Sequence, residues 1–109
     1  MSDALNAGVA ALRQRFIDRT IAQRPRFAAL RAMLTEGKLQ GAELEELRQL
    51  CHKLHGAGGT FGLPEFSAVA GQAEDWCDAM VEQPEEAGIA PRELGQVLDT
   101  LVAMIAKLG

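Results

Sequence analysis

CHKLHGAGGTFG, residues 51–62, lies on a run of apolar positions with the spacing of one helix face. Those positions are Leu44, Leu47, Cys51, Leu54, Gly58 and Phe61. On a helical wheel, His52 falls roughly 140° from the centre of this face and His55 about 80° from it. We therefore predict that His52 points to solvent and that His55 lies at the boundary.

The glycines after the histidines are unusual inside a helix, because each costs about 1 kcal/mol of helix stability relative to alanine. Gly58 lies on the apolar face, where a glycine lets another helix approach closely. Gly56 and Gly59 face outward and bracket His52 on the wheel. We interpret these two glycines as clearance that leaves the His52 imidazole uncovered for a large partner or a tetrahedral group.

An uncovered imidazole suits phosphoryl transfer, because its neutral form is a nucleophile near physiological pH. A phosphoryl group on the ring nitrogen forms a high-energy P–N bond. Its transfer needs positioning and charge stabilisation more than covalent machinery. Lys53 and His55 are predicted to offer positive or donor groups near that charge, and His55 is a neighbour on the same side of the helix.

Toward the N-terminus, apolar residues continue at helical spacing. They are Leu5, Val9, Leu12, Phe16 and Ile17. Pro25 disfavours helix at Arg24 and predicts a break or a kink. A second stripe follows and ends at Gly37. The helix that carries the histidines is expected to start near Gly41.

Toward the C-terminus, the spacing predicts a helix over 64–82, a loop over 83–90 and a last helix that Pro91 opens. Long helices joined by short loops pack antiparallel. The predicted fold class is all-α: an up-down antiparallel four-helix bundle with an additional or kinked N-terminal helix. Residues 1–109 are expected to form a single domain.

Composition narrows the possible partners. The chain has 109 residues and a net charge of −4, and no basic face for nucleic acid stands out. No apolar run approaches the ~18–20 residues of a membrane span, and the N-terminus lacks a signal peptide. We expect a cytoplasmic monomer that binds neither nucleic acid nor membrane. Cys51 and Cys77 lie on apolar faces and are expected to be buried, reduced thiols.

The run His52-Lys53-Leu54-His55-Gly56, followed by Gly62, resembles the motif of the histidine-containing phosphotransfer (HPt) domain family. That motif reads His, any residue, Leu, Lys, Gly and then a further Gly; His55 stands where the family usually has Lys. The resemblance implies that His52 is phosphorylated on Nε2, by a receiver domain's aspartyl phosphate or by a histidine kinase. A receiver aspartate would then accept the group. No resident cofactor is implied, since Mg²⁺ comes with the receiver.

Some family members, those similar to the phosphotransfer domain of chemotaxis kinases, have a carboxylate on the next helix bonded to Nδ1 of the histidine. Glu74 lies at the matching offset, and Gln72 is the rival for that contact. Such a bond would fix the tautomer of His52. A solvated helix face is the alternative for both residues. Apolar residues of the N-terminal helices are candidates for partner docking, namely Leu12, Phe16, Ile17 and Ile21, and the alternative for most of them is a place in the core.

Two other functions compete with a phosphocarrier. A metal site would use Cys51, His52 and His55, but Cys51 and His52 lie roughly 100° apart on the wheel. It would also need a fourth ligand, for which Cys77 is the only other thiol. The second alternative is a non-catalytic module that binds a receiver or kinase and carries no phosphate. An enzyme acting alone is not expected, because the sequence has no phosphate-binding GxxxxGKS loop, kinase signature or nucleophile elbow.

Overall fold

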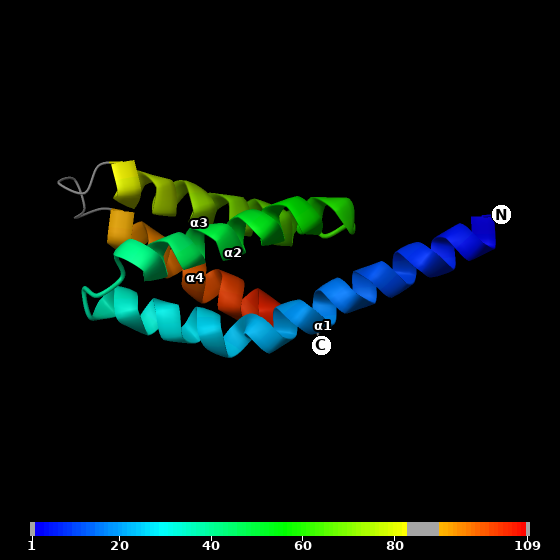
Figure 1. Cartoon of the computed structure of the whole chain (residues 1–109), viewed down its shortest axis with the longest axis horizontal. Coiled ribbons are helices and arrows are strands. Elements are labelled where there is room, and N and C mark those ends of the chain that lie inside the picture. The colour runs from blue at the N-terminus through cyan, green and yellow to red at the C-terminus, as the bar shows by residue number, and fades with distance from the viewer. Residues whose placement is uncertain (1, 83–89, 109) are drawn as a thin grey trace.

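Four α-helices make up the computed structural model, which describes residues 2–82 and 90–108. They are α1 (Ser2–Thr35), α2 (Gly41–Thr60), α3 (Pro64–Glu82) and α4 (Ala90–Ala106). Successive helices run in opposite directions and pack side by side (Figure 1). The predicted all-α, up-down four-helix bundle is confirmed. The predicted loop over 83–90 falls outside the described residues, apart from Ala90, which begins α4.

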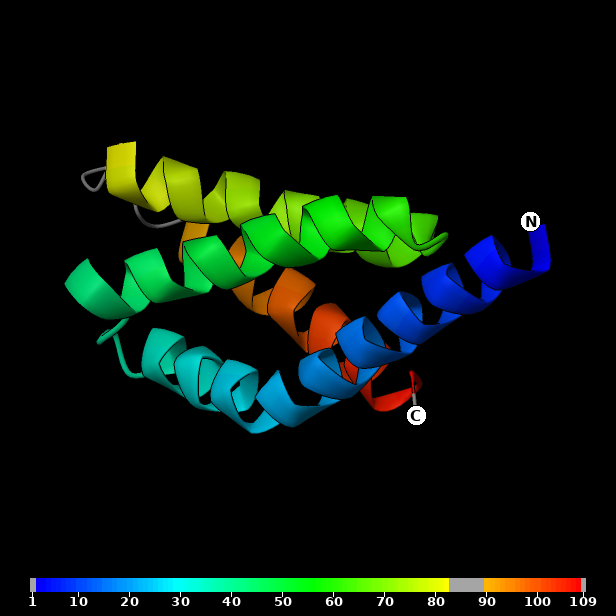
Figure 2. The same ribbon diagram turned by 45° about the vertical axis from the view of Figure 1, so that its right-hand side comes forward.

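The N-terminal helix is kinked, and no additional helix is formed there. α1 continues through Pro25 without ending, and it changes direction near its middle (Figures 1 and 2). A proline inside a helix removes one backbone hydrogen bond and clashes with the preceding turn, which bends the helix without breaking it.

Glycines with a left-handed backbone follow α1 and α2. Gly37 has a φ of 71° and Gly62 a φ of 74°, which glycine adopts without strain. In each turn the amide of the next residue bonds back to the helix. Lys38 N donates to Met33 O at 2.8 Å, and Leu63 N donates to Gly58 O at 2.8 Å. These bonds close the helix ends and return the chain antiparallel.

The core takes one apolar face from each helix. Its fully buried members are Phe27, Leu30, Leu47, Cys51, Ala70, Ala73, Cys77, Leu94, Leu98, Leu101 and Ile105. At Gly58 the helices α2 and α3 approach so closely that an added Cβ would lie 3.1 Å from Cβ of Ser67. The predicted reason for Gly58, a close helix approach, is therefore confirmed.

The first part of α1 extends beyond the bundle (Figures 1 and 2). Leu5, Val9 and Leu12 are 69%, 47% and 53% exposed, so Leu12 lies outside the core. The physical reason is length. α1 has 34 residues and α2 has 20, a difference of about 20 Å at the helical rise per residue. Ile17 is the first residue of α1 that is buried in the core.

Both cysteines are buried and free. Burial raises the pKa of both thiols, because the charged thiolate loses its hydration; the pKa of Cys77 rises to about 12. The predicted burial of two reduced thiols is confirmed. Within the described residues, no helix is both long and apolar enough to cross a bilayer.

Candidate functional site

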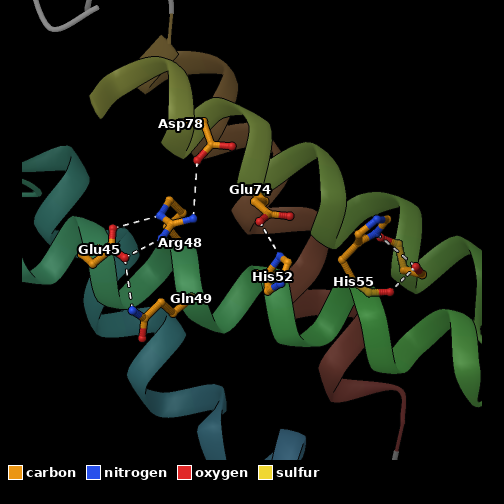
Figure 3. A network of polar contacts seen from close by, with 8 residues as sticks. Glu45, Arg48, Gln49, His52, His55, Glu74 and Asp78 are labelled. Carbon is orange, nitrogen blue, oxygen red and sulfur yellow. Dashed lines mark hydrogen bonds and ion pairs between the residues drawn. The ribbon is translucent and has the colours of Figure 1, made fainter. Parts of the chain in front are cut away.

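His52 lies midway along α2 and points away from the core toward α3 (Figure 3). Its Nδ1 is 2.7 Å from Oε2 of Glu74, on α3. A carboxylate accepts hydrogen bonds, so Nδ1 donates to Glu74, and in the neutral form of the ring Nε2 carries the lone pair. The His52 side chain is 69% exposed, whereas that of Glu74 is only 15% exposed. The structure thus places a free Nε2 at the surface and a shielded carboxylate behind the ring.

Glu74, and not Gln72, makes the contact to His52. Gln72 is exposed, and none of the hydrogen bonds among the described residues joins it to His52. Glu74 lies at the edge of the buried face of α3, one residue after the fully buried Ala73. That position aims its carboxylate along the boundary between α2 and α3, where His52 also lies.

A cation that the sequence reasoning missed lies one turn before His52 (Figure 3). Arg48 donates to both carboxylate oxygens of Glu45, at 2.9 and 2.5 Å, and its Nη1 is 3.9 Å from Asp78 on α3. The bond from Arg48 lowers the pKa of Glu45, and the same bond raises the pKa of Arg48. Its spacing of four residues before His52 was the available signal, because such residues share a helix face.

Partial burial raises the pKa of Asp78, the carboxylate that faces Arg48. The charge of Arg48 opposes this shift, and the charge of Glu74 adds to it. The boundary between α2 and α3 therefore places Arg48 between the carboxylates of Glu45 and Asp78, one helix turn from the contact between His52 and Glu74.

His55 turns toward α3 at a different place from His52 (Figure 3). Its Nδ1 is 2.9 Å from the backbone oxygen of Ser67, and Oγ of Ser67 donates to the backbone oxygen of His55 at 2.6 Å. The ring lies over Gly71, where an added Cβ would be 2.8 Å from Nδ1. Because Nδ1 is engaged, only Nε2 is available for the predicted role beside a phosphoryl group, and that role stays a prediction.

The two outward glycines differ in their surroundings. A Cβ added at Gly56 would meet nothing within 4 Å, and one added at Gly59 would lie 3.6 Å from Oγ of Ser67. Both glycines are exposed, as the wheel predicted. The surface one turn after each histidine is therefore free of side chains from its own helix.

Lys53 is exposed beside His52, on the side of α2 that faces α1. There it lines a groove of about 300 Å³, together with Phe16, Arg19, Thr20, Gln23, Leu50, Leu54 and Ala57. Of the residues expected to dock a partner, only Phe16 lines this groove. Leu12 lies on the exposed part of α1, Ile17 is buried and Ile21 is half-buried.

The three residues of the alternative metal site do not converge. Cys51 is buried in the core, whereas His52 and His55 are exposed and bonded to different residues of α3. Across residues 2–82 and 90–108, no three His, Cys, Asp or Glu side chains are grouped so that they could hold an ion.

The bundle presents the imidazole of His52 on an exposed helix face, with the carboxylate of Glu74 behind it. This arrangement suits a carrier of phosphoryl groups. The family model of the Hpt domain matches residues 11–108, which is most of the chain. The chain therefore belongs to the Hpt domain family, the phosphotransfer modules of two-component systems, which interact with receiver domains and kinases in phosphorelays. Neither a curated protein nor a solved structure matches it significantly.

Proposed function

We propose that this domain carries a phosphoryl group on Nε2 of His52. The group passes between receiver-domain aspartates, or from a histidine kinase to such an aspartate. The observation that carries the proposal is the 2.7 Å contact of Nδ1 with Glu74, together with the 69% exposure of the His52 side chain. The contact fixes the tautomer that makes Nε2 the nucleophile, and the exposure lets the phosphorus atom of a partner reach it.

The transfer needs no proton to leave Nε2. The lone pair of Nε2 attacks phosphorus, the bond from phosphorus to the aspartate oxygen breaks, and its electron pair returns to that carboxylate. Nδ1 keeps its proton throughout. The ring gains positive charge as the P–N bond forms, and the adjacent carboxylate of Glu74 stabilises that charge. The reverse transfer uses the same contacts. Mg²⁺ and the other catalytic groups belong to the partner in this proposal, so the domain is a phosphocarrier and not an enzyme acting alone.

The groove between α1 and α2 is the docking surface that we propose for the receiver. It adjoins His52 through Lys53, and its apolar floor includes Phe16, Leu50 and Leu54. Lys53 and Arg19 place positive charge along it. An aspartyl phosphate site is negatively charged, so these side chains favour the approach of that site toward His52.

A labelled-transfer assay tests the proposal. The His55→Gln variant, in which His52 is the only histidine, is mixed with a phosphorylated receiver domain and Mg²⁺. We expect acid-labile label that maps to His52, and no label in the variant that combines His52→Gln with His55→Gln. A label that maps to any other residue of His55→Gln, or equal label in the double variant, contradicts the proposal.

The competing function is a module that binds a receiver or kinase without carrying phosphate, since His55 replaces the usual lysine. Calorimetric titration of the receiver separates the two functions. If the wild type binds the phosphorylated receiver and accepts no phosphoryl group, the module is correct. If binding is accompanied by transfer to His52, the carrier is correct.

A further inference from the structure

The tautomer of His55 is set by its neighbours on α3. The hydroxyl proton of Ser67 goes to the backbone oxygen of His55, at 2.6 Å. Oγ of Ser67 can therefore only accept from Nδ1 of His55, at 3.2 Å, and the backbone oxygen of Ser67 accepts from the same nitrogen, at 2.9 Å. With two acceptors on Nδ1, that atom carries the proton and Nε2 keeps its lone pair.

The arrangement at His55 thus repeats the arrangement at His52. Each histidine is an exposed residue that directs Nδ1 toward an acceptor on α3, so the lone pair of the neutral ring is on Nε2. Each is also followed by a glycine four residues later, Gly56 after His52 and Gly59 after His55. Helix side chains lean toward the N-terminus, so a side chain at either glycine would cover the preceding histidine.

A third glycine lets the His55 ring reach its place. A Cβ at Gly71 would lie 2.8 Å from Nδ1 and 3.0 Å from Cε1 of that ring. A purely structural tie between α2 and α3 would use Nδ1 of His55, Ser67 and Gly71. It would not need an uncovered surface at Gly59.

We propose that His55 is a second phosphoryl acceptor of this domain, reacting through Nε2 with the donor class that phosphorylates His52. The proposal rests on the proposed function for the identity of that class, donors that transfer a phosphoryl group directly to an imidazole; aspartyl phosphate is the one that a receiver supplies. As at His52, the lone pair of Nε2 forms the P–N bond, and the electron pair of the broken P–O bond of aspartyl phosphate stays on the leaving carboxylate. Nδ1 keeps its proton against Ser67.

His52 and His55 differ in two ways that affect how fast each is phosphorylated. The acceptors at His55 are neutral, whereas Glu74 is a carboxylate, so we expect phosphorylation of His55 to be about tenfold slower. The histidines are also about 4.5 Å apart along the helix axis, the rise of three residues. We therefore expect a docked receiver to phosphorylate only one of the two histidines at a time, whereas a small donor can phosphorylate both.

Phosphoramidate, a small donor that phosphorylates imidazoles directly, provides the test on the full chain. By intact mass, we expect two phosphoryl groups on the wild type, one on His52→Gln, one on His55→Gln and none on the variant lacking both. If His55→Gln is labelled and His52→Gln is not, the second acceptor is wrong and the proposed function stands. If only His52→Gln is labelled, the proposed function fails and the second acceptor stands. If the variant lacking both histidines is labelled as strongly as the wild type, the second acceptor is wrong.

Fragmentation of the labelled wild-type chain keeps the proposal testable even if a variant folds poorly. It gives the ratio of phosphorylated His55 to phosphorylated His52. We expect Gly59→Gln to lower this ratio, because the new side chain covers His55, and Gly56→Gln to raise it by covering His52. A wild-type chain with no label on His55, or one ratio in all three proteins, overturns the proposal.

Discussion

Glu74 is bonded to the ring of His52 although it belongs to another helix. Its carboxylate is largely shielded, at 15% exposure, and it bonds Nδ1 at 2.7 Å. A hydrogen bond to an ionised group is roughly twice as strong as one between neutral groups. In the proposed transfer the carboxylate therefore does two things: it orients the ring, and it stabilises the charge that the ring would gain on phosphorylation of Nε2.

Replacing Glu74 with Gln separates these two contributions. The amide oxygen can still accept from Nδ1, but the negative charge is lost. We expect the rate of phosphoryl transfer to His52 to fall about tenfold, measured by rapid-quench labelling from a phosphorylated receiver. Asp75→Asn, at an exposed neighbouring position, is the matched control and should keep the wild-type rate. Equal rates in both variants would show that the charge of Glu74 has no role.

The buried thiols predict how stability depends on pH. In the unfolded chain Cys77 has the ordinary thiol pKa of 9.0, and in the folded chain burial raises its pKa to about 12. The unfolded state therefore ionises first, so the stability is intact below pH 9 and is lost as pH rises from 9 toward 12. The raised pKa of Cys51 acts in the same direction.

Urea unfolding at pH 8 and pH 10 measures this loss. We expect the free energy of unfolding to fall by about 1 kcal/mol for each thiol between the two values. The variant that combines Cys51→Ala with Cys77→Ala is less stable at both pH values, but it should lose less between them. If the wild type and this variant lose the same free energy, the thiols are not the cause.

The sequence predicts the exposure of a residue when the helix period alone decides it. It does not predict contacts that depend on how two helices align. The wheel predicted the exposure of His52 and the burial of Cys51, because helix period alone decides which face a residue occupies. The contact with Glu74 was suggested only through the family resemblance and had Gln72 as a rival. Ser67 and Gly71 were missed, because their contacts with His55 depend on how α2 and α3 align.

At the scale of the element, α2 contains glycines whose surroundings differ, so replacing them should change stability in opposite directions. Gly56 is exposed with open space around it, whereas Gly58 lies against the backbone of Ser67. The helix therefore gives up intrinsic stability at both positions, but only at Gly58 does the packing of α3 require it.

Alanine at each position shows the difference. We expect Gly56→Ala to raise the free energy of unfolding by about 1 kcal/mol, because alanine favours helix and meets no neighbour. Gly58→Ala should lower it by about 1–2 kcal/mol, because its Cβ would lie 3.1–3.2 Å from Cβ, Cα and N of Ser67. Urea denaturation of the two variants checks both signs. A gain in stability for Gly58→Ala would mean that α3 shifts freely.

The sequence predicted most of the helix pattern, and its ambiguity lay at Pro25. A proline before an apolar stripe is compatible with a break or a kink, because its local effect is the same in both. Packing decides between them. In α1 the residues on both sides of Pro25, Thr20 and Phe27, are buried within the bundle. A continuous bent helix keeps both buried.

At the scale of the whole molecule, we expect the bundle core and the extended part of α1 to contribute independently to the free energy of unfolding. The described chain measures 55 × 23 × 21 Å along its principal axes, and the long dimension includes the N-terminal extension of α1 (Figure 2). Periodicity could not reveal this extension, because apolar spacing marks a helix face without showing whether a partner helix is long enough to cover it.

Substitutions in the two regions should therefore differ in cost. We expect the combined Leu5→Gln and Leu12→Gln variant to change the free energy of unfolding by less than about 0.5 kcal/mol, because both side chains are exposed. Leu30→Ala should cost about 2–5 kcal/mol, since Leu30 is fully buried. Thermal or urea unfolding compares them. A large loss in the first variant would indicate that the extension is covered in solution.

The bond between His52 and Glu74 joins two helices as well as two functional groups, so the proposed phosphorylation of His52 is coupled to the packing of the fold. Thermodynamic linkage is reciprocal. In the proposed carrier, the free energy that the contact with Glu74 adds to phosphorylated His52 equals the free energy that phosphorylation adds to the pairing of α2 with α3. The phosphorylation equilibrium of His52 and the unfolding equilibrium of the domain then report the same coupling. The melting temperature of such a carrier therefore follows its phosphorylation state.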